Sequence, residues 1–253
     1  MPITFLDQAN TATGGTPIVF LNTISYPASP GTLIKFLCKV NTPASGITMI
    51  GGTAVKGTVA SIALPSGCAA GDWVLVVGNG TPTNAFSLAN SNPLLAMTQY
   101  TSSGVAKGLG ILGYTLTSSD ATAGSLPVNS SLNITTIAVF RSVNATPIDA
   151  QSPMAATVSV KPVVMTANSV TTTKPNDMLV FVGAVGDLGG AAVGSFTQQL
   201  GFTSISDLQN GNQALTVAYV TQATAGASGN VTCTWDNNNF GQSGSVLLAL
   251  SPA

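Results

Sequence analysis

Gly71-Asp72-Trp73-Val74-Leu75-Val76-Val77-Gly78 is matched, at an offset of 105 residues, by Asn176-Asp177-Met178-Leu179-Val180-Phe181-Val182-Gly183. Each stretch starts with a residue that tolerates a positive φ, Gly71 or Asn176, and continues with an aspartate that can cap the turn, Asp72 or Asp177. The apolar run that follows is typical of a central strand buried on both faces. The match predicts two related β halves that pack face to face around one core.

Other strand-like runs lie on both sides of these stretches, and Gly, Pro and Asn turns separate nearly all of them. They cover residues 32–40, 59–64, 134–143, 156–165, 213–222 and 245–251. Residues 86–97 are the one helix candidate, and Pro93 interrupts them. Many short strands without alternating helices predict an all-β fold, an antiparallel β-sandwich of the jelly-roll-like kind built from two weakly repeated halves.

The repeat continues beyond the matching strands but does not include the N-terminus. Tyr114 and Tyr219 are also 105 residues apart, and each is soon followed by Ala-Thr-Ala-Gly. Residues 1–57 have no counterpart, so we predict an N-terminal β-rich arm or added sheet there and the jelly-roll-like sandwich over residues 58–253. Short apolar strands between Gly and Pro breaks need a partner's sheet or groove to satisfy their backbone groups. The predicted attachment residues of the arm are Phe5, Leu6, Ile18, Val19, Phe20 and Leu21.

Charged residues are rare in this chain. They make up 6% of it, against about 25% in ordinary soluble domains. A net charge of -1 without a basic cluster argues against nucleic acid or an anionic membrane as a direct partner. The longest apolar stretch, residues 178–185, is far shorter than the roughly 20 residues of a membrane-spanning helix. The N-terminus has no signal-peptide pattern, so we expect synthesis in a cytosol.

The residue types that usually carry catalysis or bind metals are scarce. The chain has no His and no Glu, and no two of its eight aspartates are closer than ten residues in sequence. Folding could still bring two aspartates together as a glycosidase-like pair, but Asp72 and Asp177 have a simpler role as turn caps. Residues 235–241 hold one aspartate, too few for a calcium loop, and are predicted to form a polar hairpin turn. The three cysteines form no CxxC pair and are predicted to be buried small hydrophobic residues: Cys38, Cys68 and Cys233. We therefore expect no catalytic residues, no cofactor and no metal.

The aromatic residues leave an alternative open. Sugar-binding modules usually present exposed aromatic platforms, and Trp73 heads a buried strand. The remaining candidates are Tyr26, Tyr100, Tyr114 and Trp235. We interpret them as core or interface residues, with a glycan platform as the second interpretation.

Two stretches resemble a known type of domain: Leu64-Pro65-Ser66-Gly67-Cys68-Ala69-Ala70-Gly71-Asp72-Trp73-Val74-Leu75-Val76 and Val139-Phe140-Arg141-Ser142-Val143-Asn144-Ala145-Thr146-Pro147-Ile148-Asp149. They are similar to the P-x-G-x-x-x-GD opening and the Y-R-G-V…P-I-D segment of jelly-roll-like domains in tailed-phage virion proteins and some bacterial surface proteins. Phe140 and Ser142 stand where that pattern has Tyr and Gly. The resemblance covers about residues 59–252 and implies a virion building block without catalytic residues.

These features predict a non-enzymatic virion structural protein of a tailed bacteriophage, made in the host cytoplasm. We expect a capsid decoration or cement protein on the head surface, because one sandwich with an arm suits a protein that sits on a lattice. The alternatives are a tail or baseplate appendage and an extracellular glycan-binding or adhesive module, since fold analogy alone is a weak guide to function. Few charges favour self-association in closed symmetry, so the expected partners are further copies in a homotrimer and other virion proteins such as the major capsid protein.

Overall fold

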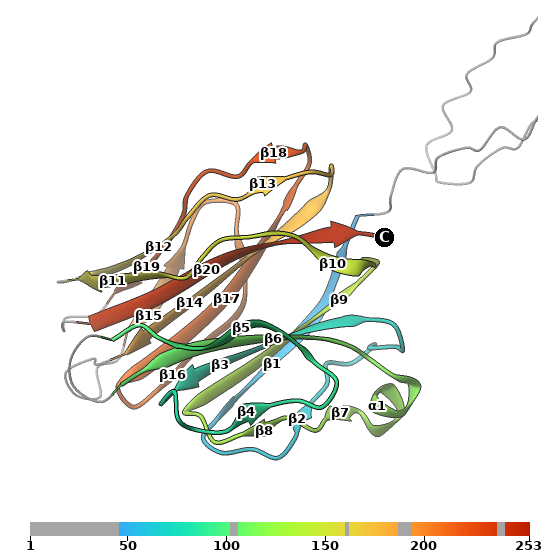
Figure 1. Cartoon of the computed structure of the whole chain (residues 1–253), viewed down its shortest axis with the longest axis horizontal. Helices are drawn as coiled ribbons and strands as arrows, with labels where there is room; N and C mark the ends of the chain where they lie inside the picture. Colours follow the sequence, from blue (N-terminus) through green and yellow to red (C-terminus); the bar gives the residue numbers. More distant parts are fainter. Residues whose placement is uncertain (1–45, 102–105, 160–161, 187–193, 237–240) are drawn as a thin grey trace, which may run out of the picture. The chain divides into compact units, whose positions relative to one another are not determined.

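The computed structural model describes residues 46–101, 106–159, 162–186, 194–236 and 241–253. Nearly all regular structure in these residues is β-strand, arranged in two large antiparallel sheets with smaller sheets beside them (Figure 1). The predicted all-β sandwich class is therefore confirmed. The predicted attachment residues lie outside the described residues, as do Tyr26, Cys38 and the strand-like run 32–40.

The first large sheet is built around β3 (Trp73–Gly80). Its strand order is β1-β9-β3-β6-β5. The partners of β3 are β6 (Gly108–Thr115) and β9 (Ile134–Arg141), and the edge strands are β1 (Thr48–Lys56) and β5 (Asn92–Gln99). Every residue of β3 is buried, as expected for a central strand that is covered on both faces.

The second large sheet is built around β14 (Asp177–Gly186), which is also buried along its whole length. Its strand order is β10-β20-β14-β17-β16, and a further strand pairs with part of β20. The other strands are β10 (Val143–Gln151), β11 (Ala155–Ser159), β16 (Thr203–Asn210), β17 (Gln213–Gln222) and β20 (Gly241–Pro252).

The two sheets repeat the same arrangement. In the first sheet β3 lies between β9 and β6, and in the second sheet β14 lies between β20 and β17. By position, β3 therefore corresponds to β14, β6 to β17 and β9 to β20. Trp73 pairs with Phe140, and its counterpart Met178 pairs with Leu250. The equivalence that the matching stretches predict is thus present in the strand order and in the register.

The spacing of the two tyrosines does not reflect this equivalence. Val74 pairs with Tyr114, whereas its counterpart Leu179 pairs with Val220. Tyr219 is therefore one position out of register with Tyr114, and in a strand one position reverses the face. Tyr114 packs against the outer cluster of the first half, and Tyr219 packs against the core between the sheets.

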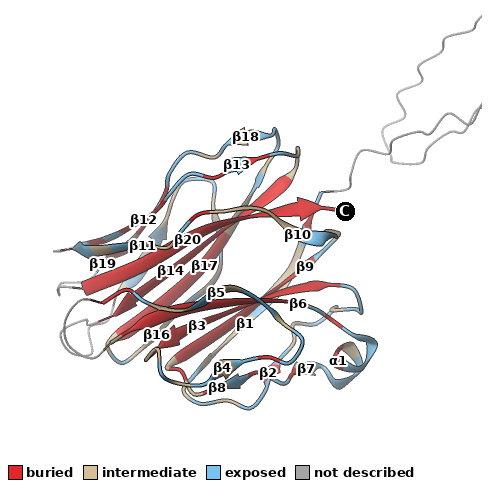
Figure 2. Ribbon diagram, viewed as in Figure 1, coloured by how far each residue is buried: buried red, intermediate tan, exposed pale blue. Residues whose placement is uncertain are grey.

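The main core lies between the two large sheets. Leu75 and Val77 of β3 join Val180 and Val182 of β14 in one apolar cluster, with all four side chains fully buried. Figure 2 shows the buried residues concentrated along the central strands of both sheets. Two further clusters cover the outer faces, which is why the central strands lack the polar alternation of a half-exposed strand.

Short elements cover these outer faces. Over the first sheet lie β2 (Ile62–Ala63), β4 (Phe86–Ser87), α1 (Ser118–Ala123), β7 (Ser125–Leu126) and β8 (Asn129–Ser130). Over the second sheet lie β12 (Val163–Ala167), β13 (Thr171–Thr172), β15 (Ser195–Gln198), β18 (Gly226–Ala227) and β19 (Val231–Asp236).

The sandwich begins earlier than the predicted boundary at residue 57. The compact unit runs from Ser45 to Ala253, and β1 pairs with β9 along its whole length. The sequence obscures β1 because Gly51 and Gly52 lie at its centre. A Cβ on Gly52 would lie 2.4 Å from Cγ2 of Ile205, so close packing between β1 and β16 requires glycine there. The predicted arm therefore loses residues 45–57 to the sandwich.

Residues 86–97 contain β4 and most of β5 instead of a helix. Pro93 is tolerated in β5 because this strand lies at the sheet edge. The helix in the described part of the chain is α1, which the sequence analysis did not predict. Its signals are local: Thr117 caps the N-terminus in a capping box with Asp120, and Gly124 ends the helix at φ 64°.

Candidate functional site

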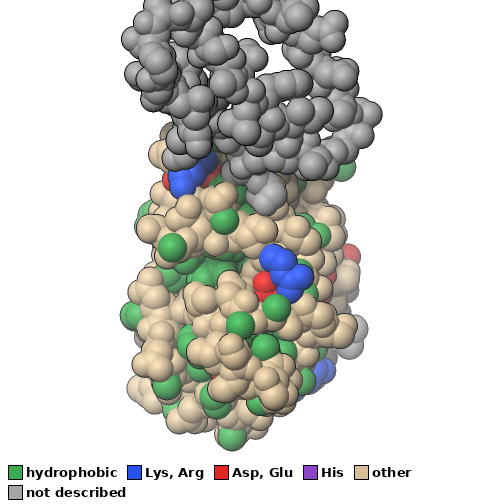
Figure 3. Space-filling model, turned by 90° about the vertical axis from the view of Figure 1, so that its right-hand side faces the viewer, with side chains coloured by type: hydrophobic (Ala, Val, Ile, Leu, Met, Phe, Trp, Pro, Cys, Tyr) green, Lys and Arg blue, Asp and Glu red, His purple; other side chains and the backbone are tan. Residues whose placement is uncertain are grey.

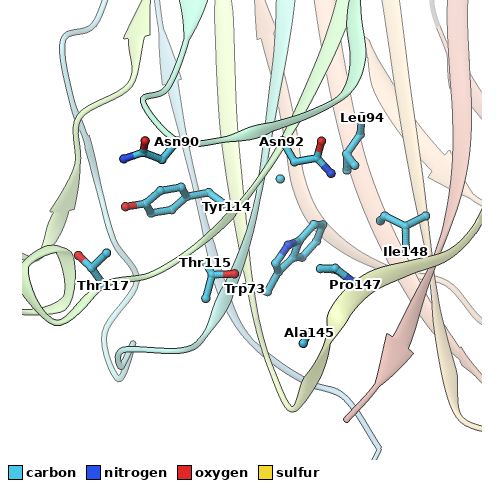
Figure 4. A pocket seen from close by; sticks show the side chains of 11 residues that line it. Trp73, Asn90, Asn92, Leu94, Tyr114, Thr115, Thr117, Ala145, Pro147 and Ile148 are labelled. Carbon is cyan, nitrogen blue, oxygen red and sulfur yellow. The ribbon is translucent and has the colours of Figure 1, made fainter.

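A pocket of about 350 Å³ opens where β3 begins and β6 ends (Figure 4). Its volume falls in the range of roughly 300–1,000 Å³ that is common for small-ligand sites. The lining comes from both large sheets, because β10 closes the side opposite β5. The lining residues are Trp73, Asn90, Asn92, Leu94, Gly113, Tyr114, Thr115, Thr117, Ala145, Pro147 and Ile148.

Trp73 forms the inner wall of the pocket. It is the first residue of β3, directly after the turn at Gly71 and Asp72, and its ring centroid lies 6.1 Å from that of Phe140. Gly113 makes room for the indole, since a Cβ there would lie 2.8 Å from Cζ2 of Trp73. Trp73 is only 4% exposed, so packing fixes it and little of it reaches solvent.

Tyr114 is the half-buried aromatic residue of the pocket, and α1 holds it in place. Its hydroxyl donates a hydrogen bond to Oδ2 of Asp120 at 2.8 Å, and the same carboxylate accepts from the main-chain N–H of Thr117 at 2.9 Å. Burial alone would raise the pKa of Asp120, but these hydrogen bonds outweigh it and lower the pKa. Burial and the contact with Asp120 raise the pKa of Tyr114, so the ring is a neutral, fixed surface at physiological pH.

Two asparagines form the polar rim. Asn90 has a φ of 60°, a left-handed conformation that asparagine tolerates well, and Ser91 fixes the turn by donating to the Leu88 carbonyl at 2.7 Å. Asn90 and Asn92 are exposed, and neither side-chain amide has a hydrogen-bond partner within the described residues. Each amide offers one acceptor and two donor hydrogens. Figure 4 shows the Asn92 amide on the side of Leu94, whereas the Asn90 amide lies beside the Tyr114 ring.

The chemistry of this pocket suits binding better than catalysis. Its described lining contains no Asp, Lys, Arg or Cys, and its one titratable group is the Tyr114 hydroxyl, which is engaged with Asp120. Amide, hydroxyl, aliphatic and aromatic groups remain. Such a lining can orient an uncharged ligand, but it offers neither a general base nor an activated nucleophile.

The predicted turn residues lie at the start of the central strands. Gly71 has a φ of 88° and Asn176 has a φ of 63°, in the left-handed region that the sequence pattern requires. Asp72 caps its turn by accepting from the main-chain N–H of Ala69 at 2.8 Å. It also forms two 2.8 Å contacts with Arg141, one to Nε and one to Nη2. Arg141 in turn donates to the Gly67 carbonyl at 2.8 Å, so the two stretches of the resemblance meet at this point.

Asp177 has a different environment from Asp72. It is completely buried, and neither carboxyl oxygen has a hydrogen-bond partner of good geometry within the described residues. Its neighbour is Asp149, whose oxygens accept from the main-chain N–H and the hydroxyl of Thr173. Burial and the contact with Asp149 raise the pKa of Asp177 to about 7, an effect that Lys174 offsets only in part.

The fold therefore does bring two aspartates together, although not with glycosidase geometry. Glycosidases hold their two carboxyl groups roughly 5–9.5 Å apart, with the sugar between them. Here Asp177 has no exposed surface, so a sugar cannot reach its carboxyl group. Burial beside Asp149 instead favours the protonated form of Asp177.

The other residues that the sequence singled out are core residues or lie outside the described part. Trp235 is 2% exposed and packs against Phe196 with centroids 4.4 Å apart. Tyr100 is buried, and its hydroxyl donates to Oδ1 of Asn79 at 2.8 Å. Both agree with the predicted core role. Cys233 is also buried, whereas Cys68 is half-buried; both are free thiols. The tip of the predicted 235–241 turn, residues 237–240, is outside the described residues.

The sequence pattern singles out the aromatic residues Trp73 and Tyr114 but does not indicate the pocket that they line. Asn90 and Asn92 lie in a polar stretch with no motif, and Ile148 comes from the opposite sheet. Comparison with protein families, with curated proteins and with solved structures finds no match. In the described residues, no three metal-ligating side chains gather into a group. None of the helices described there is long and apolar enough to span a bilayer.

Proposed function

We propose that this chain is a non-enzymatic structural protein of a tailed-bacteriophage virion that decorates the surface of the head. The observation that carries the proposal is the nearly uncharged surface. Within the described residues, the exposed charged side chains are Lys56, Arg141, Asp207 and Asp236. Arg141 is already paired with Asp72. Figure 3 shows one face on which uncharged side chains predominate and the few charged ones lie in small separate groups.

Such a surface favours association. Surface charge of one sign, or a dense mixture of both signs, normally keeps soluble proteins apart, and this chain has a net charge of only -1. Desolvating uncharged polar and apolar groups costs less than desolvating charges. A protein that is covered by neighbours in a particle can therefore dispense with charges. The proposed partners are further copies in a closed homotrimer and the major capsid protein.

The joined motif stretches support the proposal through their structural role. Arg141 of the second stretch reaches Asp72 and Gly67 of the first. Ser142 has a φ of 63°, and it stands where the phage-domain pattern has glycine, the residue best suited to that conformation. The features that resemble phage domains are thus contacts and turns that build the sandwich.

The test is the location and copy number of the protein in purified particles. Quantitative mass spectrometry against the major capsid protein should give a stoichiometry that matches the lattice positions of the head. Adding the purified protein to particles that lack it should restore the same occupancy. A few copies per particle would identify a tail or baseplate appendage instead, and absence from particles would refute the virion role.

A further inference from the structure

A groove of about 370 Å³ lies on the outer face of the second large sheet. Its floor is apolar, because Leu179 of β14 and Val220 of β17 are cross-strand neighbours on this face and Val231 lies with them in the outer cluster. The rest of the lining comes from the turn at residues 199–202 and from the segment at residues 221–228. The described lining has no charged side chain, so the groove suits an uncharged aliphatic group.

The turn at residues 199–202 displays a leucine to solvent beside this groove. The main-chain N–H of Phe202 donates to the Gln199 carbonyl at 3.0 Å, and Gly201 has a φ of 92°. A tight turn of this type requires a positive φ at its third position but no apolar residue at its second. Leu200 occupies that second position and is 100% exposed, so its side chain fills no space in its own chain. The fold therefore does not account for the leucine.

Leu200 and the groove complement each other. Removing an exposed leucine side chain from water is favourable, and the groove floor offers it aliphatic neighbours. The other exposed large hydrophobic side chains of the described residues are less accessible: Val158 is 56% exposed and Val164 is 39% exposed. Every copy of the chain carries both the projecting leucine and the groove, so a second copy provides the matching surface.

Charge also favours a second copy over a charged partner. Two copies bring identical charges to their contact, and like charges that face each other are unfavourable. The described lining of the groove avoids this repulsion because it contains amide, hydroxyl and apolar groups without charge. A strongly charged segment of another protein would find no counter-charge there.

The small sheet beside the groove can extend the contact. Gln199 accepts a 2.8 Å hydrogen bond from the main-chain N–H of Thr232, which joins the turn to β19. In the strand register Val164, Thr234 and Thr197 form one row across β12, β19 and β15 on the side away from the core. A stable interface needs about 800 Å² from each partner, more than one leucine and one groove provide. This row of uncharged side chains can supply further area.

We infer that the Leu200 turn and this groove form the contact between copies of the chain, with Leu200 of one copy inserted over Leu179 and Val220 of the next. Each copy offers one leucine and one groove, so a closed oligomer satisfies both. The inference rests on the self-association in the proposed function and names the surface responsible.

Sedimentation velocity of the full chain over a range of concentrations tests the inference. Leu200→Ser should raise the dissociation constant of the oligomer at least tenfold, whereas Leu200→Met, which keeps an apolar side chain, should stay within about threefold of the parent. Thr224→Lys places a charge in the groove and should also weaken association at least tenfold. Thr122→Lys adds the same charge on α1 and should change it by less than about twofold.

Cross-linking between differently tagged chains places the leucine in the groove. A chain with Leu200→Cys is mixed with a chain with Thr224→Cys and treated with a short bismaleimide, so a product that contains both tags reports a contact between copies. This product should exceed that from Leu200→Cys mixed with Thr122→Cys. Mixed parent chains give the background from the native thiols, of which Cys68 is half-buried.

Three results would overturn the inference. The first is a parent chain that stays monomeric at every concentration. The second is association as tight as that of the parent in both Leu200→Ser and Thr224→Lys; both altered residues are exposed, so these substitutions test the contact without disturbing the core. The third is equal cross-linking in the two mixed pairs. Association through another face would refute this contact alone, whereas association through Leu200 by a protein absent from particles would refute the virion role alone.

Discussion

Asp72 and Asp177 follow equivalent turns, yet the two halves use them differently. Asp72 pairs with Arg141 at the end of β9. The register places Ser251 of β20 at the position of Arg141, and Ser251 accepts a 2.6 Å hydrogen bond from Lys174 instead. The second half therefore has no guanidinium for Asp177, and the neighbour of Asp177 is another carboxyl group, that of Asp149. The repeat predicts both turns correctly, but the residue that each aspartate meets from another strand differs between the halves.

The buried Asp177 should make stability depend on pH. Its pKa is about 7 in the folded chain and near 3.9 when unfolded, so between these values only the folded state keeps the proton. The free energy of unfolding should therefore fall as pH rises, by up to about 1.4 kcal/mol per pH unit. The chain has no His, so no side chain with an ordinary pKa titrates in the upper part of this window, between about pH 5 and 7. Urea unfolding at several pH values measures the slope.

Asp177→Asn is the control for this slope. The amide keeps a donor for Asp149 and cannot ionise, so the variant should be nearly insensitive to pH in this window and more stable than the parent above about pH 7. Although burial would raise the pKa of Asp149, its Thr173 hydrogen bonds lower it, so Asp149 loses its contribution only in more acidic solution. A parent protein with a flat profile would contradict the assignment.

Asp72→Ala should destabilise the fold. It removes the acceptor for the Ala69 main-chain N–H and for Arg141 in the turn that leads into β3. The expected loss is about 1–2 kcal/mol of unfolding free energy, typical of a lost cap. Asp236→Ala, an exposed aspartate at the end of β19, should change stability by less than about 0.5 kcal/mol. Equal effects of the two substitutions would show that the Asp72 turn contributes little.

At the scale of elements, the sequence predicts strands that are buried on both faces and misses those at the edges. Unbroken apolar runs predict β3 and β14. The edge strand β1 has two central glycines and β5 contains Pro93, so neither shows a regular alternation. Their place is decided by the sheet edge that they join, a long-range contact that local pattern does not encode.

Because β1 belongs to the sandwich and not to the predicted arm, the expected result of N-terminal truncation changes. A chain that begins at residue 46 keeps all described strands and should unfold cooperatively. A chain that begins at residue 58 loses β1, whose Met49 packs against the main core and whose Ile50 and Val55 pack against the outer cluster of the first half. The shorter chain should be less stable by about 3 kcal/mol or more. Equal denaturant midpoints for the two chains would show that β1 is dispensable.

At the scale of the whole molecule, fold class follows from the sequence but the pocket does not. Tyr114 is visible as an aromatic residue, yet the pocket residues Asn92 and Ile148 come from different sheets. Their meeting depends on how the sheets pack, and free amides such as those of Asn90 and Asn92 have no sequence signature. The low charge, in contrast, can be read from composition alone, and it is the property on which the proposed function depends.

We propose that other chains cover this weakly charged surface in the assembled particle. Multi-angle light scattering after size-exclusion chromatography, over a wide range of protein concentrations, tests the claim most directly. We predict a closed oligomer with a constant mass, most simply a trimer of three times the 25.3 kDa chain mass. A mass of 25.3 kDa at every concentration, with no binding to particles, would contradict the account.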